Sequence, residues 1–208
     1  MNVQLLAMKT DSIPVRWRPR LMLLFIIACF AAPLAAAWWL VGRWQPDGSV
    51  QHGELLNPAR PLSALRFTPW HENGPDGMAL RGHWVLAYVG AGRECDTACQ
   101  TALYDLRQVR LALGKDMTRV KTVFLLADAP VAELRRWLAT EHAAMIVGVA
   151  DSTVRAELAG AFPMPGAAGE WIYLLDPLGN LLMRYPAAVE PRGMLEDLQR
   201  LLRLSKIG

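Results

Sequence analysis

The stretch Gly82–Gln100, GHWVLAYVGAGRECDTACQ, decides the fold because it joins a strand-like apolar run to two closely spaced cysteines. The run Trp84–Val89 leads through a glycine-containing loop to Cys95 and Cys99, and a helical pattern follows at Leu103, Leu106, Val109 and Leu113. This order predicts a strand, a loop and a helix, with the cysteines at the helix start. On one helical turn, positions i and i+4 share a face with Cα atoms about 6 Å apart, near the upper end of disulfide reach. The pair is expected to form a disulfide or to share a soft metal ion.

The chemistry of this pair depends on its surroundings. The positive end of a helix dipole stabilises a thiolate, whereas the negative charges of Glu94 and Asp96 oppose it. The alternative interpretation is that two cysteines four residues apart are ordinary core residues or form one inert structural disulfide, because cysteine is commonly buried. The spacing alone leaves both interpretations open.

The N-terminal part of the chain predicts a membrane anchor. The run from Leu21 to Gly42 contains no charged residue and is long enough for the about 20 residues that cross a bilayer. Basic residues precede this run and tryptophans crowd its far end: Lys9, Arg16, Arg18 and Arg20, then Trp38, Trp39 and Trp44. By the positive-inside rule, residues 1–20 are expected in the cytoplasm and residues 21–42 form a single transmembrane helix of the inner membrane.

A cleaved signal peptide is the alternative, with processing at the small residues Ala35, Ala36 and Ala37. In either case the later residues are exported to the periplasm, an oxidising location where a close cysteine pair can cycle or close as a disulfide. Cys29 lies inside the apolar run and is expected to act as a small hydrophobic residue.

Residues 43–81 read as a linker that wraps into the domain edge, because prolines and glycines recur there without a long periodic pattern. The pieces Leu55–Pro58 and Leu62–Phe67 are candidates for pairing at a sheet edge. His52 and His71 lie in this segment and are candidates for a third ligand beside the cysteines, although a lone histidine in a polar loop is more often solvated.

Beyond the cysteines, the order of elements predicts an architecture. Strands are expected at Trp84–Val89, Val120–Leu126, Met145–Val149, Trp171–Leu175 and Leu181–Tyr185, and helices at Leu103–Leu113, Val131–Leu138, Ser152–Leu158 and Pro191–Leu204. The last two strands form a hairpin around Asp176–Asn180, with Gly179 at positive φ. The order is that of an α/β, thioredoxin-like domain over residues 82–208, with a central mixed sheet flanked by helices.

The block GHWVLAYVGAGRECDTACQTALYDLRQVR, with RVKTVFLL and WIYLLDPLGN further on, resembles the Sco/SenC family. These are membrane-anchored, thioredoxin-like proteins that assist the assembly of the copper centres of cytochrome c oxidase. The resemblance covers roughly Gly82–Leu204. It implies copper bound by Cys95, Cys99 and a histidine, and a respiratory oxidase subunit or another assembly factor as the partner.

The histidine of that family has no counterpart here. Its position, counted back from Tyr173, falls near Ala168, and the loop from Phe162 to Trp171 contains no histidine. Aspartate also replaces the usual proline after the first cysteine. Two thiolates suit linear Cu(I), and the thioether of Met164 is a candidate soft ligand, although methionine is more often a gap-filler. We therefore expect weak binding of one Cu(I) at most, and hardly any Cu(II).

Three functions from different classes remain. The first is a Sco-like assembly factor that acts through thiol redox chemistry or weak copper binding. The second is a general exported thiol-disulfide oxidoreductase, and the third is a non-catalytic adapter with a structural disulfide. For redox chemistry, Cys95 is expected to be the more exposed, attacking thiol and Cys99 the resolving one. A formal net charge of +3 with mixed signs throughout gives no stripe for nucleic acid.

Overall fold

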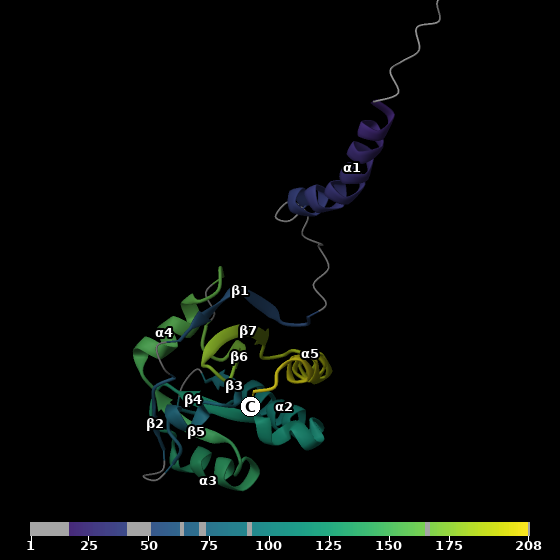
Figure 1. Cartoon of the computed structure of the whole chain (residues 1–208). Coiled ribbons are helices and arrows are strands. Elements are labelled where there is room, and N and C mark those ends of the chain that lie inside the picture. Colours follow the sequence, from purple (N-terminus) through teal and green to yellow (C-terminus); the bar gives the residue numbers. More distant parts are fainter. Residues whose placement is uncertain are drawn as a thin grey trace, which may run out of the picture. The chain divides into compact units, whose positions relative to one another are not determined.

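The computed structural model describes residues 17–40, 51–62, 65–70, 74–90, 93–164 and 167–207. The chain divides into two compact units, Met1–Ser49 and Val50–Gly208, which are taken in turn below. Figure 1 shows both, with the sequence running from purple to yellow.

The first unit contains one helix, α1, Trp17–Leu40. None of its residues is buried, although its best window has a mean hydropathy of 2.4. Within the described residues, it is the one helix long and apolar enough to cross a membrane. Pro33 lies inside it without ending it. The helix covers the predicted span from Leu21 to Leu40, and the last two residues of that span lie outside the described residues.

The second unit is built on a mixed seven-stranded sheet in the order β1-β7-β6-β3-β4-β5-β2. The strands are β1 Glu54–Pro61, β2 Phe67–Pro69, β3 Trp84–Val89, β4 Val120–Leu126, β5 Ile146–Ala150, β6 Trp171–Leu175 and β7 Asn180–Pro186. β3, β4 and β5 run parallel, and the other pairs are antiparallel. The predicted strands are all present, with β3, β4 and β6 at the predicted bounds. The two edge strands, β1 and β2, come from the segment that precedes β3.

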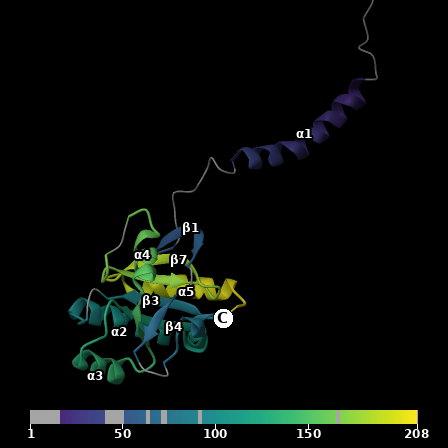
Figure 2. The same cartoon turned by 90° about the vertical axis from the view of Figure 1, so that its left-hand side faces the viewer.

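Helices cover both faces of this sheet. They are α2 Thr97–Ala112, α3 Ala132–Glu141, α4 Ser152–Gly160 and α5 Pro191–Leu204, with short 3₁₀ helices at η1 Gly77–Leu80 and η2 Gly114–Arg119. Buried residues of α2, α3 and α5 join one core cluster, and those of α4 join the other. Figure 1 shows α4 and α2 on opposite sides of the sheet, and Figure 2 turns the α4 side toward the viewer. The structure confirms the thioredoxin-like α/β fold.

The central strand β3 explains why both faces need helices. All six of its residues are buried, and successive side chains of a strand point to opposite faces. Trp84, Leu86 and Tyr88 enter the cluster under α2, whereas Val85, Ala87 and Val89 enter the cluster under α4. A continuous apolar run is typical of a strand buried on both faces.

The hairpin between β6 and β7 is held by one side chain. The Asp176 carboxylate accepts hydrogen bonds from the backbone N–H of Leu178 at 2.9 Å, from that of Asn180 at 2.8 Å, and from the Asn180 side chain at 2.8 Å. Gly179 follows at φ 91°, as the sequence predicts. A Cβ at Gly179 would meet no atom within 4 Å. A side chain there would therefore destabilise the fold only through the free energy of holding the backbone at positive φ.

Replacing Gly179 with valine is expected to lower the free energy of unfolding by about 1–2 kcal/mol, because β-branched residues rarely adopt positive φ. Gly160→Val is the matched control. Gly160 ends α4, also has open space around it, and lacks the positive φ, so its free energy of unfolding should change by less than about 0.5 kcal/mol. Urea unfolding of both variants measures the difference. Equal midpoints for Gly179→Val and the unchanged protein would contradict the backbone argument.

Candidate functional site

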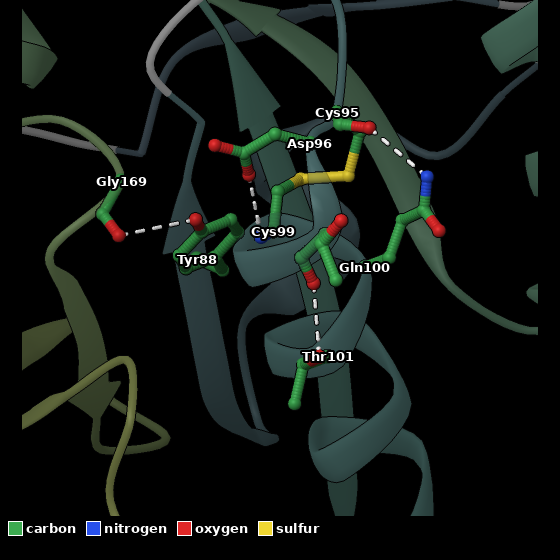
Figure 3. Close-up of a disulfide and its surroundings, with 8 residues drawn as sticks. Tyr88, Cys95, Asp96, Cys99, Gln100, Thr101 and Gly169 are labelled. Atoms are coloured by element: carbon green, nitrogen blue, oxygen red, sulfur yellow. Dashed lines mark hydrogen bonds between the residues drawn. A yellow bond between two sulfur atoms is a disulfide. The ribbon is translucent and has the colours of Figure 1, made fainter.

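A disulfide joins Cys95 and Cys99 at the end of the loop after β3, with their Cα atoms 5.2 Å apart (Figure 3). The helix α2 begins at Thr97, so Cys95 precedes it and Cys99 lies in its first turn. The conditional expectation that both cysteines share one helical turn is therefore corrected. The pair straddles the helix boundary, and this brings the two Cα atoms closer than the about 6 Å of a regular helix.

Asp96 fixes this boundary. Its side chain accepts a hydrogen bond from the backbone N–H of Cys99 at 2.9 Å, and its carbonyl accepts one from the backbone N–H of Gln100 at 2.9 Å. This is the bonding of an N-cap residue, which satisfies amides that a helix start leaves without partners. The side-chain amide of Gln100 donates to the carbonyl of Cys95 at 3.1 Å. Asp96 was not predicted as a cap from the sequence, although aspartate before a helical pattern is a recognisable capping signal.

The two sulfur-bearing residues differ in access to solvent. Cys99 is 5% exposed and packs in the core under α2, whereas Cys95 is half-buried and lies at the edge of that core. Cys95 also lines an open groove of about 380 Å³ between the cysteine loop and α3, and Cys99 does not. The order of exposure is the one that the sequence predicts. Cys95 is therefore the more accessible residue of the pair.

Tyr88, the next-to-last residue of β3, lies beside the disulfide in Figure 3. Its hydroxyl donates to the carbonyl of Gly169 at 3.2 Å, and the backbone N–H of Gly169 donates to the carbonyl of Val89 at 2.7 Å. Burial raises the pKa of Tyr88, and the negative charge of Asp96 adds to this effect. The phenol therefore stays neutral and keeps its donor. Tyr88 was not predicted as a site residue, because a tyrosine within an apolar strand reads as an ordinary core residue.

These two hydrogen bonds place the loop before β6 against Tyr88, which itself lies beside the disulfide (Figure 3). Ala168, where the resemblance puts a histidine, directly precedes Gly169 and is exposed. The loop position thus follows the contacts with Tyr88 and Val89 at the end of β3, and the residue that occupies it has no ligand atom in its side chain. The side chain of Met164, in the same loop, is also exposed, at 71%. It therefore does not fill a gap in the core.

The histidines that the structure describes have other surroundings. His52 pairs with Glu196 of α5 at 3.2 Å, and its backbone N–H donates to Asp197. His142 ends α3 and packs against Trp137 with ring centroids 4.7 Å apart. Its burial lowers its pKa, so the ring is neutral. His71 lies outside the described residues. Among the residues described, no third His, Cys, Asp or Glu joins the cysteines in a metal-binding group.

A buried arginine holds the other end of this loop. Arg184 of β7 is 1% exposed and pairs with Glu54 of β1 at 2.7 Å. It donates to the carbonyl of Met164 at 2.8 Å, and its guanidinium lies 3.8 Å from the ring centroid of Trp171 and 4.4 Å from that of Phe162. Arg184 thus ties together β1, β7 and the loop before β6. No sequence signal marked it, since an arginine within a strand reads as an outward-facing residue.

Solved structures of Sco proteins and of a putative protein disulfide isomerase share this fold. ScoI from Bradyrhizobium japonicum, with copper bound, is 21% identical and has a TM-score of 0.50 over 67% of this chain and 98% of that chain. BsSco, a member of the Sco family of cytochrome c oxidase assembly proteins with a disulfide switch, is 14% identical, with a TM-score of 0.54 over 71% and 96%. A putative protein disulfide isomerase from Bacteroides thetaiotaomicron is 13% identical, with a TM-score of 0.53 over 74% and 95%. At these identities the likeness establishes the fold alone.

A search of the curated proteins found no match to this sequence. One protein family does match, over residues 84–205, which is more than half of the chain, and it is described as the transmembrane-like, thioredoxin-like, C-terminal domain. The match begins at β3 and ends just after α5, so it contains the disulfide, Tyr88 and the loop before β6. Together with the apolar helix α1, it suggests membrane anchoring. The chain belongs to this transmembrane-like, thioredoxin-like family.

Proposed function

We propose that this chain is a membrane-anchored, Sco-like protein that performs thiol-disulfide exchange at Cys95 and Cys99 and assists the assembly of cytochrome c oxidase. In this proposal residues 1–20 are cytoplasmic, 21–42 span the membrane, 43–81 link to the domain, and 82–208 form the exported domain. The partner is an oxidase subunit or another assembly factor.

The observation that carries the proposal is the asymmetric placement of the disulfide. Exchange needs one sulfur atom that a foreign thiolate can reach and a second that is held close by to leave and return. Cys95 is half-buried beside an open groove, while Cys99 is buried and held by the cap from Asp96. A permanent structural disulfide does not need an accessible sulfur atom. The solved Sco structures, one of them from a protein with a disulfide switch, support the assembly role.

The reduction potential tests this function directly. An exchanging pair is expected to equilibrate with glutathione at a potential above about −300 mV, whereas structural disulfides generally lie below that value. Equilibration of the full-length protein in graded glutathione buffers, read by alkylation and mass spectrometry, gives the potential. A disulfide that stays closed throughout would favour the third function, a non-catalytic adapter.

Copper fits the described donor atoms poorly. When the pair is reduced, two thiolates can hold Cu(I) in linear fashion, but stable Cu(II) in such a site needs a nitrogen ligand as well. Ala168 supplies none, and Met164 is exposed. We propose that copper is at most weakly bound cargo and that thiol chemistry is the main activity.

Titration of the reduced, full-length protein is expected to give at most one weakly bound Cu(I) and hardly any Cu(II). Competition with a chromophoric Cu(I) chelator measures the first, and absorbance in the charge-transfer region measures the second. Ala168→His is the informative variant, because it adds an imidazole at the loop position beside Tyr88. It should increase Cu(II) binding by at least tenfold. Tight, stoichiometric Cu(II) binding by the unchanged protein would falsify this part of the proposal and point to a histidine such as His71.

A general exported thiol-disulfide oxidoreductase is the second candidate. The same accessible Cys95 supports it, as does the fold shared with a putative protein disulfide isomerase. The client separates the two functions. Mixed disulfides trapped in cells should contain an oxidase subunit or assembly factor if the first proposal is right, and a broad set of exported proteins if the second is right.

The apolar helix is expected to remain attached to the mature protein, since it is longer than the apolar region of a signal peptide. The intact mass of protein purified from membranes measures this. Protease added to spheroplasts should digest the domain and spare residues 1–20. A mature chain that begins after Ala37 would show that the segment is a cleaved signal.

A further inference from the structure

The groove beside the disulfide combines an apolar floor with an acidic rim. Val131, Leu134 and Trp137, all from the start of α3 and its first turns, supply apolar atoms. The charged residues that line the groove are Glu94, from the cysteine loop, and Glu133, from the first turn of α3. Both are exposed, and neither has an ion-pair partner among the described residues. A surface of this kind favours a partner that brings apolar and positively charged side chains together.

Two arginines near the groove each donate a hydrogen bond to a backbone carbonyl and do not line the groove. The Nε of Arg93 donates to the carbonyl of Ala129 at 3.3 Å, and the Nε of Arg135 donates to that of Pro130 at 3.1 Å. Both hydrogen bonds hold the turn that leads into α3, and neither arginine lines the groove. The backbone N–H of Val131 also donates to the carbonyl of Arg93 at 3.4 Å. The cysteine loop and α3 are thus tied to each other, which keeps the two glutamates on one preformed surface.

Cys95 lines the same groove, so a segment lying there would lie against the more exposed residue of the disulfide. We propose that the groove is the docking site for a cysteine-bearing segment of a partner protein whose cysteine is flanked by basic residues. The proposal rests on the proposed thiol-disulfide exchange and names its substrate class. In the elementary step, the partner thiolate forms a bond to Sγ of Cys95 and the Cys95–Cys99 bond breaks. Cys99 leaves as a thiolate with the electron pair, and the proton of the partner thiol goes to solvent.

The test uses the full-length protein in a zwitterionic detergent and short peptides with one central cysteine. One peptide has arginines around the cysteine, one has glutamates, and one has serines. The rate of mixed-disulfide formation is measured by mass spectrometry and divided by the rate with 2-mercaptoethanol, which is small and uncharged. This division removes effects of the substitutions on the reactivity of Cys95 itself. The variants are Glu94→Gln, Glu133→Gln and their combination.

The control variant is Glu190→Gln, which removes one negative charge from an exposed position before α5, outside the groove. The normalised rate of the arginine peptide should exceed that of the glutamate peptide by at least tenfold at low salt. The double variant should reduce this rate ratio by about five- to tenfold, and the control should leave it unchanged. Added salt should lower the ratio, since exposed charge pairs are screened.

The outcomes separate this inference from the proposed function. The docking site would be overturned, and exchange would remain, if the protein reacts with 2-mercaptoethanol but shows no preference among the peptides. A preference that the double variant retains would have the same meaning. A disulfide that 2-mercaptoethanol fails to open would overturn exchange. In that case, calorimetry tests the docking site by itself, with arginine and glutamate peptides that carry serine in place of cysteine. Tighter binding of the arginine peptide, weakened in the double variant, would support the docking site. Equal binding of the two peptides would refute it.

Discussion

Replacing Cys95 with serine is expected to abolish thiol-disulfide exchange, because the remaining Cys99 is buried under α2 and is not a lining residue of the groove. Cys99→Ser should have the opposite outcome. The accessible Cys95 would still form a mixed disulfide with a partner, and without the second thiol the mixed disulfide would persist. The first variant should therefore lose activity by at least a thousandfold, whereas the second should accumulate covalent complexes.

The measurement is recovery of partners from membranes on a non-reducing gel, together with the rate of alkylation of each single-cysteine variant. Iodoacetamide should modify Cys95 faster than Cys99. The matched control is Cys29→Ser, which removes the free cysteine of α1 and should alter neither result. Faster alkylation of Cys99 would reverse the assigned roles. Exchange that survives Cys95→Ser would show that another thiol performs the chemistry.

Arg184→Ala is expected to lower the free energy of unfolding by about 3 kcal/mol. The substitution removes a 1% exposed side chain that lies between two aromatic rings, so it leaves a cavity, and it also frees the Met164 carbonyl. Breaking the pair with Glu54 contributes less than for a fully buried pair, because the side chain of Glu54 is 41% exposed and regains water.

Arg184→Met separates packing from charge. Methionine keeps most of the contact with the rings, so the loss should be about half that of the alanine variant. The control is Arg192→Ala, where an arginine that is 79% exposed also pairs with a glutamate, and the loss should stay below about 1 kcal/mol. Chemical denaturation of all three variants gives the comparison. If Arg184→Ala and Arg192→Ala lower the free energy of unfolding by the same amount, then Arg184 does not stabilise the domain as its contacts indicate.

Local pattern was enough to predict most of the sheet and helices. The runs of β3, β4 and β6 are apolar and end at clear breaks, so their bounds followed from the sequence. Pro191 starts α5 at the predicted residue because proline suits a first helical turn. The cysteine pair was also recognisable from spacing, and its disulfide is present.

Contacts between distant segments could not be predicted in this way. Arg184 meets Glu54 across 130 positions of sequence, and no periodic pattern records such a pairing. Tyr88 and Gly169 are likewise joined by a hydrogen bond over 81 positions. The helix starts at Thr97, between the two cysteines where the sequence predicts it, but the capping role of Asp96, which sets the first residue, was not considered. The contacts of Arg184 and Tyr88 are the features that hold the loop before β6 in place.

The position of β1 and β2 at opposite edges of the sheet has a consequence for the order in which the domain forms. Both strands leave the ribosome before β3, yet β1 can pair only with β7, which is among the last parts to be made. Long-range pairings of this kind slow folding, and an open sheet edge can pair with a neighbouring chain. The growing chain must therefore keep β1 unpaired until β7 follows, and this interval is when a newly made copy is most exposed to aggregation or to protection by a chaperone.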